Sequence, residues 1–232
     1  MRLNQYIASS GICSRRVADK LISDKKVKIN NKIAVLGDII KEGDVVIVDN
    51  KQITAIDKKI YIALNKPVGI TCTTEKHVKG NIVDFIDYNH RIFPIGRLDK
   101  QSEGLILLTN DGSIVNKLLR KENNHEKEYI VKLDKDITAE FLHHIRKGVT
   151  IYNPVSKRHV KAHTISVDKL NKDTIKIILN SGLNHQIRRM CHALGYEVIS
   201  LRRTRIVNLT LQNIKVGEWR YLTDSEVSNL IS

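Results

Sequence analysis

The first fifty residues combine two helical periodicities with two short apolar runs. Leu3, Tyr6 and Ile7 have i, i+3, i+4 spacing and Gly11 follows, which predicts a short helix that ends at a glycine. Ser14 predicts the N-cap of a second helix. The apolar stripe of that helix consists of Val17, Ala18, Leu21 and Ile22. Strand-like runs at 26–29 and 44–48 complete a segment of two helices and a small sheet.

From residue 60 onward the apolar runs are longer. They predict strands at 61–64, 105–108, 127–133, 158–167, 174–179 and 197–209. Helical spacing predicts helices at 113–120, 138–147 and 184–194. Consecutive strands with intermittent helices indicate an α+β fold with a mixed, largely antiparallel sheet flanked by helices. We therefore expect a small domain at 1–50, a polar linker at 51–59 and a second domain at 60–232.

The charge balance changes this picture. The 232 residues include 39 Lys and Arg against 25 Asp and Glu, a formal charge of +14, within a globular composition that is 41% hydrophobic and 28% charged. Such a surplus indicates an anionic partner, of which nucleic acid is the commonest. No apolar run approaches the ~20 residues of a membrane span, and the N-terminus lacks a signal-peptide core, so a cytoplasmic location without membrane contact is expected.

The cations of the second helix are candidates for contact with that partner. Arg15, Arg16 and Lys20 lie off the apolar stripe, and a helix N-terminus is a natural seat for a phosphate. An ordinary solvated face is the alternative. Because only 5% of the residues are aromatic, any base stacking must depend on one or two rings.

A glycine-bounded polar segment at 96–104 leads directly into the apolar run 105–108. Loops tied to a rigid strand are where reactive groups tend to be positioned. Asp99 lies between Arg97 and Lys100, which favours its ionised form, and an ionised carboxylate can act as a nucleophile or a base. An aspartate between cations is more often a surface ion pair, so the residues alone leave its role open.

Two further basic segments are candidates for the site. In the helix 184–194, Arg188 falls at the edge of the buried stripe and Arg189 points nearly opposite it. In the run 201–206, strand alternation would present Arg203 and Arg205 on one face, for contact with RNA or with solvent.

Other chemistries have little support in the sequence. The three cysteines are far apart and form no disulfide framework, and the histidine pairs lack a second cluster at zinc-ligand spacing, so no metal is expected. Phosphate-binding glycine loops and the G-x-S-x-G element of hydrolases are absent from the sequence.

The first fifty residues resemble the small RNA-binding domain of the ribosomal protein S4 type. The likeness rests on Arg2-Leu3-Asn4-Gln5-Tyr6-Ile7, Ser14-Arg15-Arg16 and Val27-Lys28-Ile29-Asn30. It implies that the second helix lies on structured RNA. The RNA-contacting residues expected here are Arg2, Arg15, Arg16 and Lys20.

The remainder resembles the RNA pseudouridine synthases of the RsuA type. Gly96-Arg97-Leu98-Asp99 and Ser102-Glu103-Gly104-Leu105 match that family's signature, and Leu64-Asn65-Lys66-Pro67, Lys127-Glu128-Tyr129, Gln186-Ile187-Arg188-Arg189 and Leu201-Arg202-Arg203 follow in family order.

The resemblance implies a role for each matched residue. Asp99 would add to the target uridine, Arg188 would pair with its carboxylate, and Tyr129 would stack on the uracil. Ile187 would line the pocket, Arg97 would fill the gap left by the flipped nucleotide, and Lys66 and Pro67 would support the Tyr129 ring. The further RNA contacts expected are Arg189, Arg203 and Arg205. No metal or organic cofactor is implied.

The implied reaction is isomerisation of uridine to pseudouridine by a catalytic domain at 60–232. Large-subunit ribosomal RNA is the expected partner and tRNA a second candidate, with a monomer and no obligate protein partner. Two alternatives are a hydrolytic RNA glycosidase, in which Glu103 or Asp111 would join Asp99, and a non-catalytic ribosome-assembly factor.

Overall fold

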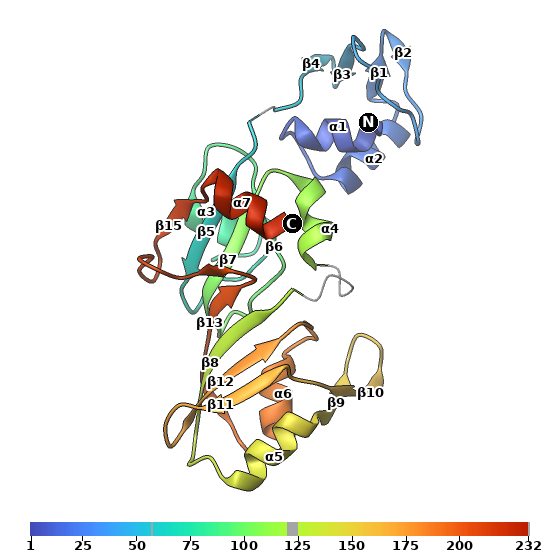
Figure 1. The fold of residues 1–232 in the computed structure, drawn as a ribbon. Coiled ribbons are helices and arrows are strands. Elements are labelled where there is room, and N and C mark those ends of the chain that lie inside the picture. The colour runs from blue at the N-terminus through green and yellow to red at the C-terminus, as the bar shows by residue number, and fades with distance from the viewer. Residues whose placement is uncertain (57, 120–124, 232) are drawn as a thin grey trace. The chain divides into compact units, whose positions relative to one another are not determined.

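The computed structural model describes residues 1–56, 58–119 and 125–231 of the chain (Figure 1). Contacts divide it into two compact units. The first consists of Met1–Ile60 with the short segments Tyr88–Phe93 and Thr109–Gly112, and the second contains the other residues. None of the helices in the described ranges is long and apolar enough to cross a membrane.

The N-terminal unit contains the two predicted helices and a four-stranded antiparallel sheet. The helices are α1 (Leu3–Ser9) and α2 (Arg15–Ser23), and the sheet order is β2 (Lys32–Ile33), β1 (Val27–Ile29), β3 (Val46–Val48) and β4 (Lys51–Ile53). Their shared core consists of Leu3, Ile7, Ala18, Ile22, Val27, Ala34, Ile40, Val46, Val48 and Ile53.

The second helix begins as the sequence predicts. The Ser14 side chain accepts a hydrogen bond from the Val17 N–H at 3.3 Å, which confirms the N-cap. The prediction that Val17 is buried is wrong, because Val17 is 48% exposed. The core-facing stripe is centred on Ala18 and Ile22, and each successive residue is rotated by about 100° around the axis.

The predicted linker contains a strand in its first half. Asp49 and Asn50 both have positive φ angles, 45° and 64°, the backbone that a two-residue hairpin turn requires. The chain therefore reverses after β3 and pairs again as β4, a contact that composition alone does not reveal.

The second unit is built around a mixed sheet. Its main path has the order β11 (Ser166–Lys169), β12 (Thr174–Leu179), β8 (Lys127–Leu133), β13 (Val198–Ile206), β7 (Glu103–Thr109), β5 (Tyr61–Lys66) and β15 (Trp219–Tyr221). Off this path β14 (Leu209–Thr210) pairs with β13, and β6 (Phe93–Ile95) pairs with β7. The β13–β7 pair is parallel, whereas β8, β12 and β11 are joined antiparallel. The α+β prediction is confirmed.

Helices and a separate hairpin complete the chain. The helices are α3 (Ile82–Ile86), α4 (Gly112–Leu119), α5 (Ala139–Lys147), α6 (Gln186–Ala193) and α7 (Asp224–Ile231). The hairpin consists of β9 (Val149–Asn153) and β10 (Arg158–Ala162). The single strand predicted at 158–167 is wrong, because β10 pairs with β9 while β11 pairs with β12 in the main sheet.

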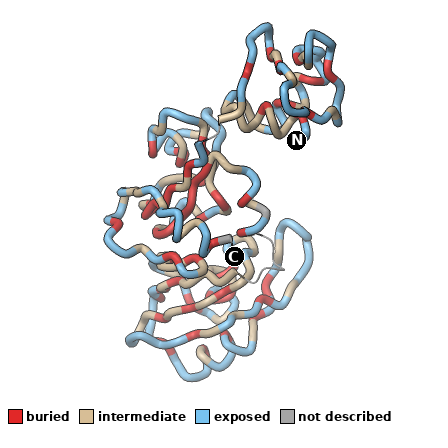
Figure 2. The backbone as a smooth tube through the Cα atoms, turned by 45° about the horizontal axis from the view of Figure 1, so that its top comes forward, coloured by how far each residue is buried: buried red, intermediate tan, exposed pale blue. Residues whose placement is uncertain are grey.

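The strand β7 lies at the centre of the core. Its residues from Gly104 to Thr109 are all buried, and runs of such positions are red in Figure 2. One cluster around it contains Ala63, Ile95, Leu105, Leu107, Ile114, Leu118, Ile206, Leu209, Ile214 and Leu230. Gly104 allows the backbones of β7 and β13 to approach closely, because a Cβ built on it would lie 2.3 Å from the Arg203 carbonyl oxygen. A rigid central strand therefore begins a few residues after Asp99.

Candidate active site

The Asp99 loop joins β6 to β7 and is fixed at both ends. Leu98 is buried, and its N–H donates to the Sγ of Cys72 at 3.4 Å. The N–H of the buried Ser102 donates to the Asp99 carbonyl at 3.0 Å. The Asp99 side chain between these anchors is 29% exposed. The loop thus presents one carboxylate at the surface from a backbone that is held on either side.

The carboxylate faces a histidine that the sequence analysis did not select. His185 Nε2 lies 3.4 Å from Asp99 Oδ1, and the His185 side chain is 47% exposed. His185 precedes α6 with a φ of 50°, in the left-handed region that side chains seldom adopt. Strained backbone of this kind clusters at functional sites. The only signal in the sequence was its place in the predicted helix 184–194, three residues before Arg188.

Arg188 lies beside the loop but does not hold the carboxylate. Its guanidinium donates to the carbonyls of Val198 and Gln101, both at 3.1 Å, and to Ser102 Oγ at 3.4 Å. Among the described residues its Nε has no hydrogen-bond partner. The expected ion pair with Asp99 is absent from the described part of the chain, because the carbonyls of Gln101 in the loop and of Val198 on β13 take up these donors. Arg188 therefore holds the loop instead of its carboxylate.

Lys66 supports the same loop from β5. It is fully buried, and its Nζ donates to the carbonyls of Pro67 at 2.8 Å and Ile70 at 2.9 Å. Burial lowers the pKa of Lys66, while the nearby Cys72 and Asp99 act in the opposite direction. Gly69, within the turn that Lys66 holds, donates its N–H to the Lys100 carbonyl at 2.8 Å.

The expected support of the Tyr129 ring by Lys66 and Pro67 stays a prediction. Tyr129 is on β8, and β13 and β7 lie between β8 and β5 in the sheet, a separation of about 14 Å between backbones. The hydrogen bonds of the Lys66 Nζ go to the carbonyls of Pro67 and Ile70. Tyr129 is 8% exposed and Ile187, on α6, is 4% exposed, so both side chains are largely covered.

A β-bulge separates the two arginines that were expected on one face of β13. Arg203 pairs in register with Tyr129, but Arg205 pairs with Glu128, and the irregularity between them breaks the alternation. Arg203 is 3% exposed, and its Nε donates to the Leu105 carbonyl at 2.7 Å. Its side chain is thus not presented at the surface, which weakens the expectation that it contacts an RNA backbone.

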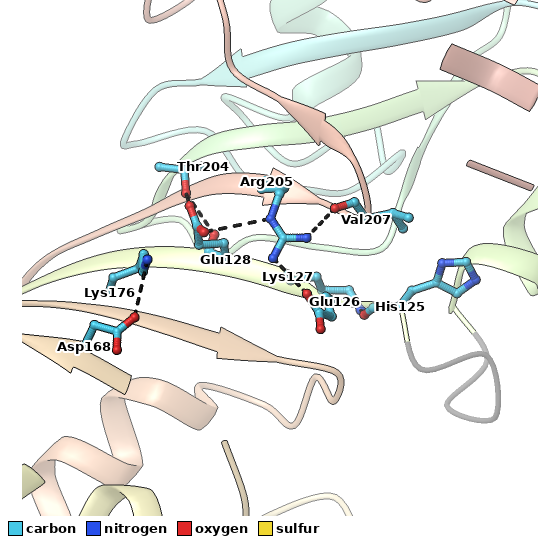
Figure 3. Close-up of polar contacts among 9 residues, drawn as sticks. All are labelled: His125, Glu126, Lys127, Glu128, Asp168, Lys176, Thr204, Arg205 and Val207. Carbon is cyan, nitrogen blue, oxygen red and sulfur yellow. Dashed lines mark hydrogen bonds and ion pairs between the residues drawn. The ribbon is translucent and has the colours of Figure 1, made fainter. Parts of the chain in front are cut away.

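Arg205 lies among carboxylates (Figure 3). Its Nη2 is 2.9 Å from Glu126, its Nε is 3.8 Å from Glu128, and Thr204 donates to Glu128 at 2.7 Å. The charge of Arg205 is therefore compensated within the protein, which weakens the expectation that it binds RNA.

The remaining predicted RNA contacts differ in exposure. Arg2, Arg15, Arg16 and Lys20 are all exposed. Arg189, in contrast, is half-buried. Its guanidinium donates to the Tyr152 carbonyl and, at 3.0 Å, to Asn184 Oδ1. The described residues contain no group of three or more His, Cys, Asp or Glu that could hold a metal ion. A partly exposed carboxylate on a braced loop is thus the candidate reactive group of the second unit.

Comparison with known proteins places both parts of the chain. A family model described as RNA pseudouridylate synthase matches residues 60–193, and the S4 domain model matches residues 1–46. The chain belongs to the RNA pseudouridylate synthase family. As a member of this family it is an isomerase that acts on RNA, and its N-terminal unit contains an S4-type RNA-binding domain.

Several relatives of this RNA pseudouridine synthase cover nearly the whole chain. The dual-specificity RNA pseudouridine synthase RluF of Salmonella typhi is 52% identical over 99% of this chain and 78% of its own length. Ribosomal large subunit pseudouridine synthase B of Bacillus subtilis is 34% identical over 99% of this chain and 95% of its own length. The motif order favours the subgroup of ribosomal large subunit pseudouridine synthase F, and the similarity to RluF confirms it.

A solved structure supports the fold. The crystal structure of a pseudouridylate synthase superposes with a TM-score of 0.70 at 29% identity and covers 99% of both chains. The family rules against the two alternative readings of the site, since it makes the chain an isomerase instead of a hydrolytic glycosidase or a silent assembly factor.

Proposed function

We propose that this synthase converts uridine to pseudouridine in large-subunit ribosomal RNA and also in tRNA, with Asp99 as the nucleophile. The observation that supports Asp99 is its place on the loop before β7, where the side chain is 29% exposed while Leu98 and Ser102 anchor the backbone in the core. A carboxylate held in this way is positioned before substrate arrives, which lowers the cost of reaching the reacting geometry.

The proposed reaction balances without an added reagent. The Asp99 carboxylate adds to the target nucleotide, the bond from uracil N1 to ribose C1′ breaks, and the base turns. A bond then forms between uracil C5 and C1′, the C5 proton leaves, N1 gains a proton, and Asp99 is released unchanged. Arg188 and Lys66 keep the loop in place, and His185 orients the carboxylate before the nucleotide enters.

The surrounding residues suggest how the nucleotide is held. Tyr129 and Ile187 supply largely covered apolar surface for the uracil. Arg97 is exposed beside Asp99, as a residue must be that replaces a flipped nucleotide in the RNA stack. Arg2, Arg15, Arg16 and Lys20 provide the RNA contacts of the N-terminal domain. We propose that this domain extends from the expected boundary at residue 50 to Ile53, because β4 pairs with β3, and that the linker follows at 54–59.

The substrate proposal draws on the relatives. The Bacillus subtilis relative is named for the large ribosomal subunit, and the Salmonella typhi relative is named for dual specificity. Unmodified 23S ribosomal RNA and tRNA transcripts labelled with tritium at uridine C5 test it directly. Tritium release from both RNAs is expected, since the C5 proton leaves, with no free uracil. Release from neither RNA would overturn the substrate proposal.

The role of the N-terminal domain has a separate test. Replacing Arg15 and Arg16 by alanine should weaken RNA binding and lower the slope of log K against log salt by about 1.4, at about 0.7 for each single-strand phosphate contact. The rate at saturating RNA should stay within twofold. An unchanged salt slope would show that these arginines do not contact phosphates.

A further inference from the structure

The β9–β10 hairpin has one covered face and one free face. Val149 and Ile151 on β9 and Ala162 on β10 are buried, and α6 packs against β9. Cross-strand partners share a face, so the opposite face carries Tyr152 beside His159 and Thr150 beside Lys161. All four of these residues are exposed. The hairpin, drawn in gold in Figure 1, thus presents an outer surface that no described helix or strand of its own unit covers.

Two rings lie together on this outer surface. The ring centroids of Tyr152 and His159 are 5.5 Å apart with an interplanar angle of 62°, and Tyr152 is 47% exposed. Val155, in the turn between the strands, is 83% exposed. In a chain with only 5% aromatic residues, an exposed ring pair is an uncommon use of aromatic surface. Proteins that bind unpaired RNA bases stack them on such side chains.

The charge around the rings is uncompensated. The sequence contains no Asp or Glu between Glu140 and Asp168. Lys157, Arg158 and Lys161 are exposed, and no described carboxylate lies within 4.0 Å of them. Elsewhere in the unit cations are often neutralised, as Lys176 is by Asp168 at 3.3 Å. Lys161 shares the outer face with the rings and Lys157 lies in the adjoining turn, whereas Arg158 pairs with Asn153 on the other face. Two unpaired cations beside an exposed ring pair favour an anionic partner that also has flat apolar groups.

The hairpin is fixed to the element that braces the site. Arg189 on α6 donates to the Tyr152 carbonyl, and the preceding residue, Arg188, donates to Gln101 and Ser102 at the end of the Asp99 loop. A nucleotide bound on the hairpin would therefore belong to the same RNA whose uridine reaches Asp99.

We propose that the outer face of the β9–β10 hairpin is an RNA-binding surface, on which an unpaired base stacks against Tyr152 and His159 while Lys161 on this face and Lys157 in the adjoining turn bind backbone phosphates. The choice of RNA rests on the family and on the proposed substrates, but the surface does not depend on the role of Asp99. It supplies contacts outside the target nucleotide and so contributes to the choice of substrate.

The first test measures the phosphate contacts. The full chain in which Lys157 and Lys161 are both changed to glutamine is titrated with unmodified 23S ribosomal RNA transcript at several salt concentrations. The slope of log K against log salt should fall by about 1.4, at about 0.7 for each contact. The control Lys176→Gln removes one cation that Asp168 already compensates and should leave the slope unchanged. Equal slopes in the double variant and wild type would overturn the proposal.

The second test measures the stacking. Tyr152→Ala should weaken binding about 5- to 150-fold, the loss expected for one stacked base, whereas Tyr152→Phe should stay within about twofold of wild type. The loss should appear in KM with kcat retained, unlike the loss of kcat expected at Asp99. Wild-type affinity for Tyr152→Ala, or binding of an acidic protein in place of RNA, would overturn the proposal. An unchanged thermal midpoint of each variant excludes unfolding as the cause.

Discussion

Replacing Gly104 by alanine should destabilise the catalytic unit strongly, because two separate costs meet at this position. Gly104 has a φ of +110°, which side chains rarely adopt. The added Cβ would also lie 2.3 Å from the carbonyl oxygen and 2.7 Å from the nitrogen of Arg203. Those atoms are backbone and belong to β13, so the parallel β7–β13 pair must separate to admit a methyl group.

Gly69 is a matched control from which the expected loss of unfolding free energy at Gly104 can be estimated. Gly69 has a φ of +93°, but nothing lies within 4 Å of its added Cβ among the described residues. A strained backbone conformation costs of order 1–3 kcal/mol, and overpacking adds about 1–3 kcal/mol. Gly69→Ala should therefore lower the free energy of unfolding by about 1–3 kcal/mol, and Gly104→Ala by about 2–6 kcal/mol.

Urea denaturation measures the difference. The protein has one tryptophan, Trp219, and it lies on β15 of the same sheet, so its fluorescence reports unfolding of this unit. The midpoint for Gly104→Ala should fall well below that for Gly69→Ala at a similar m-value. Free energies equal within about 0.5 kcal/mol would refute the account of a close β7–β13 approach.

Three further predictions concern side chains of the second unit. Arg188→Ala should lower kcat about 10- to 100-fold with little change in RNA affinity, because the Asp99 loop loses charged hydrogen bonds; unchanged single-turnover rates would contradict this. Hydrogen bonds from Arg220 lower the pKa of Glu226 from 4.5 to about 2, so this pair stabilises the fold above about pH 4.5 and the contribution is lost as the pH falls toward 2. Arg220→Gln should therefore flatten the dependence of the thermal midpoint on pH between 5 and 2, and a curve parallel to wild type would count against the pair. Burial raises the pKa of Cys191 to about 12, so mass spectrometry should find it unalkylated at pH 8 until urea unfolds the chain, and rapid native labelling would show that it is accessible.

Local sequence patterns predicted those helices and strands whose structure depends on residues close in the chain. The strands at 127–133 and 174–179 have the predicted bounds, and buried positions alternate from Tyr129 to Leu133 on β8 and along the whole of β12. Ser14 caps α2 through a contact three residues away, which sequence spacing describes well. Such features depend on residues that are close in the chain.

The features that could not be predicted depend on distant partners. The bulge in β13 arises from its pairing with β8, about 75 residues away, and it turns Arg205 toward Glu128 while Arg203 stays buried. Lys66 is linked to the Asp99 loop through the turn at 67–70, and this link can be predicted only when the order of the strands in the sheet is known. His185 faces Asp99 only because α6 packs beside that loop. Periodicity contains no information on these contacts.

The central claim is that the Asp99 carboxylate carries out the isomerisation. Asp99→Asn keeps the shape and removes the charge, and Asp87→Asn makes the same change at an exposed residue whose φ of 49° asparagine tolerates. The most direct measurement is tritium release from 23S ribosomal RNA labelled at uridine C5, with RNA affinity measured in parallel. We predict that Asp99→Asn releases no tritium above background and binds RNA within twofold of wild type, while Asp87→Asn releases it normally. Release by Asp99→Asn at the wild-type rate would contradict the account.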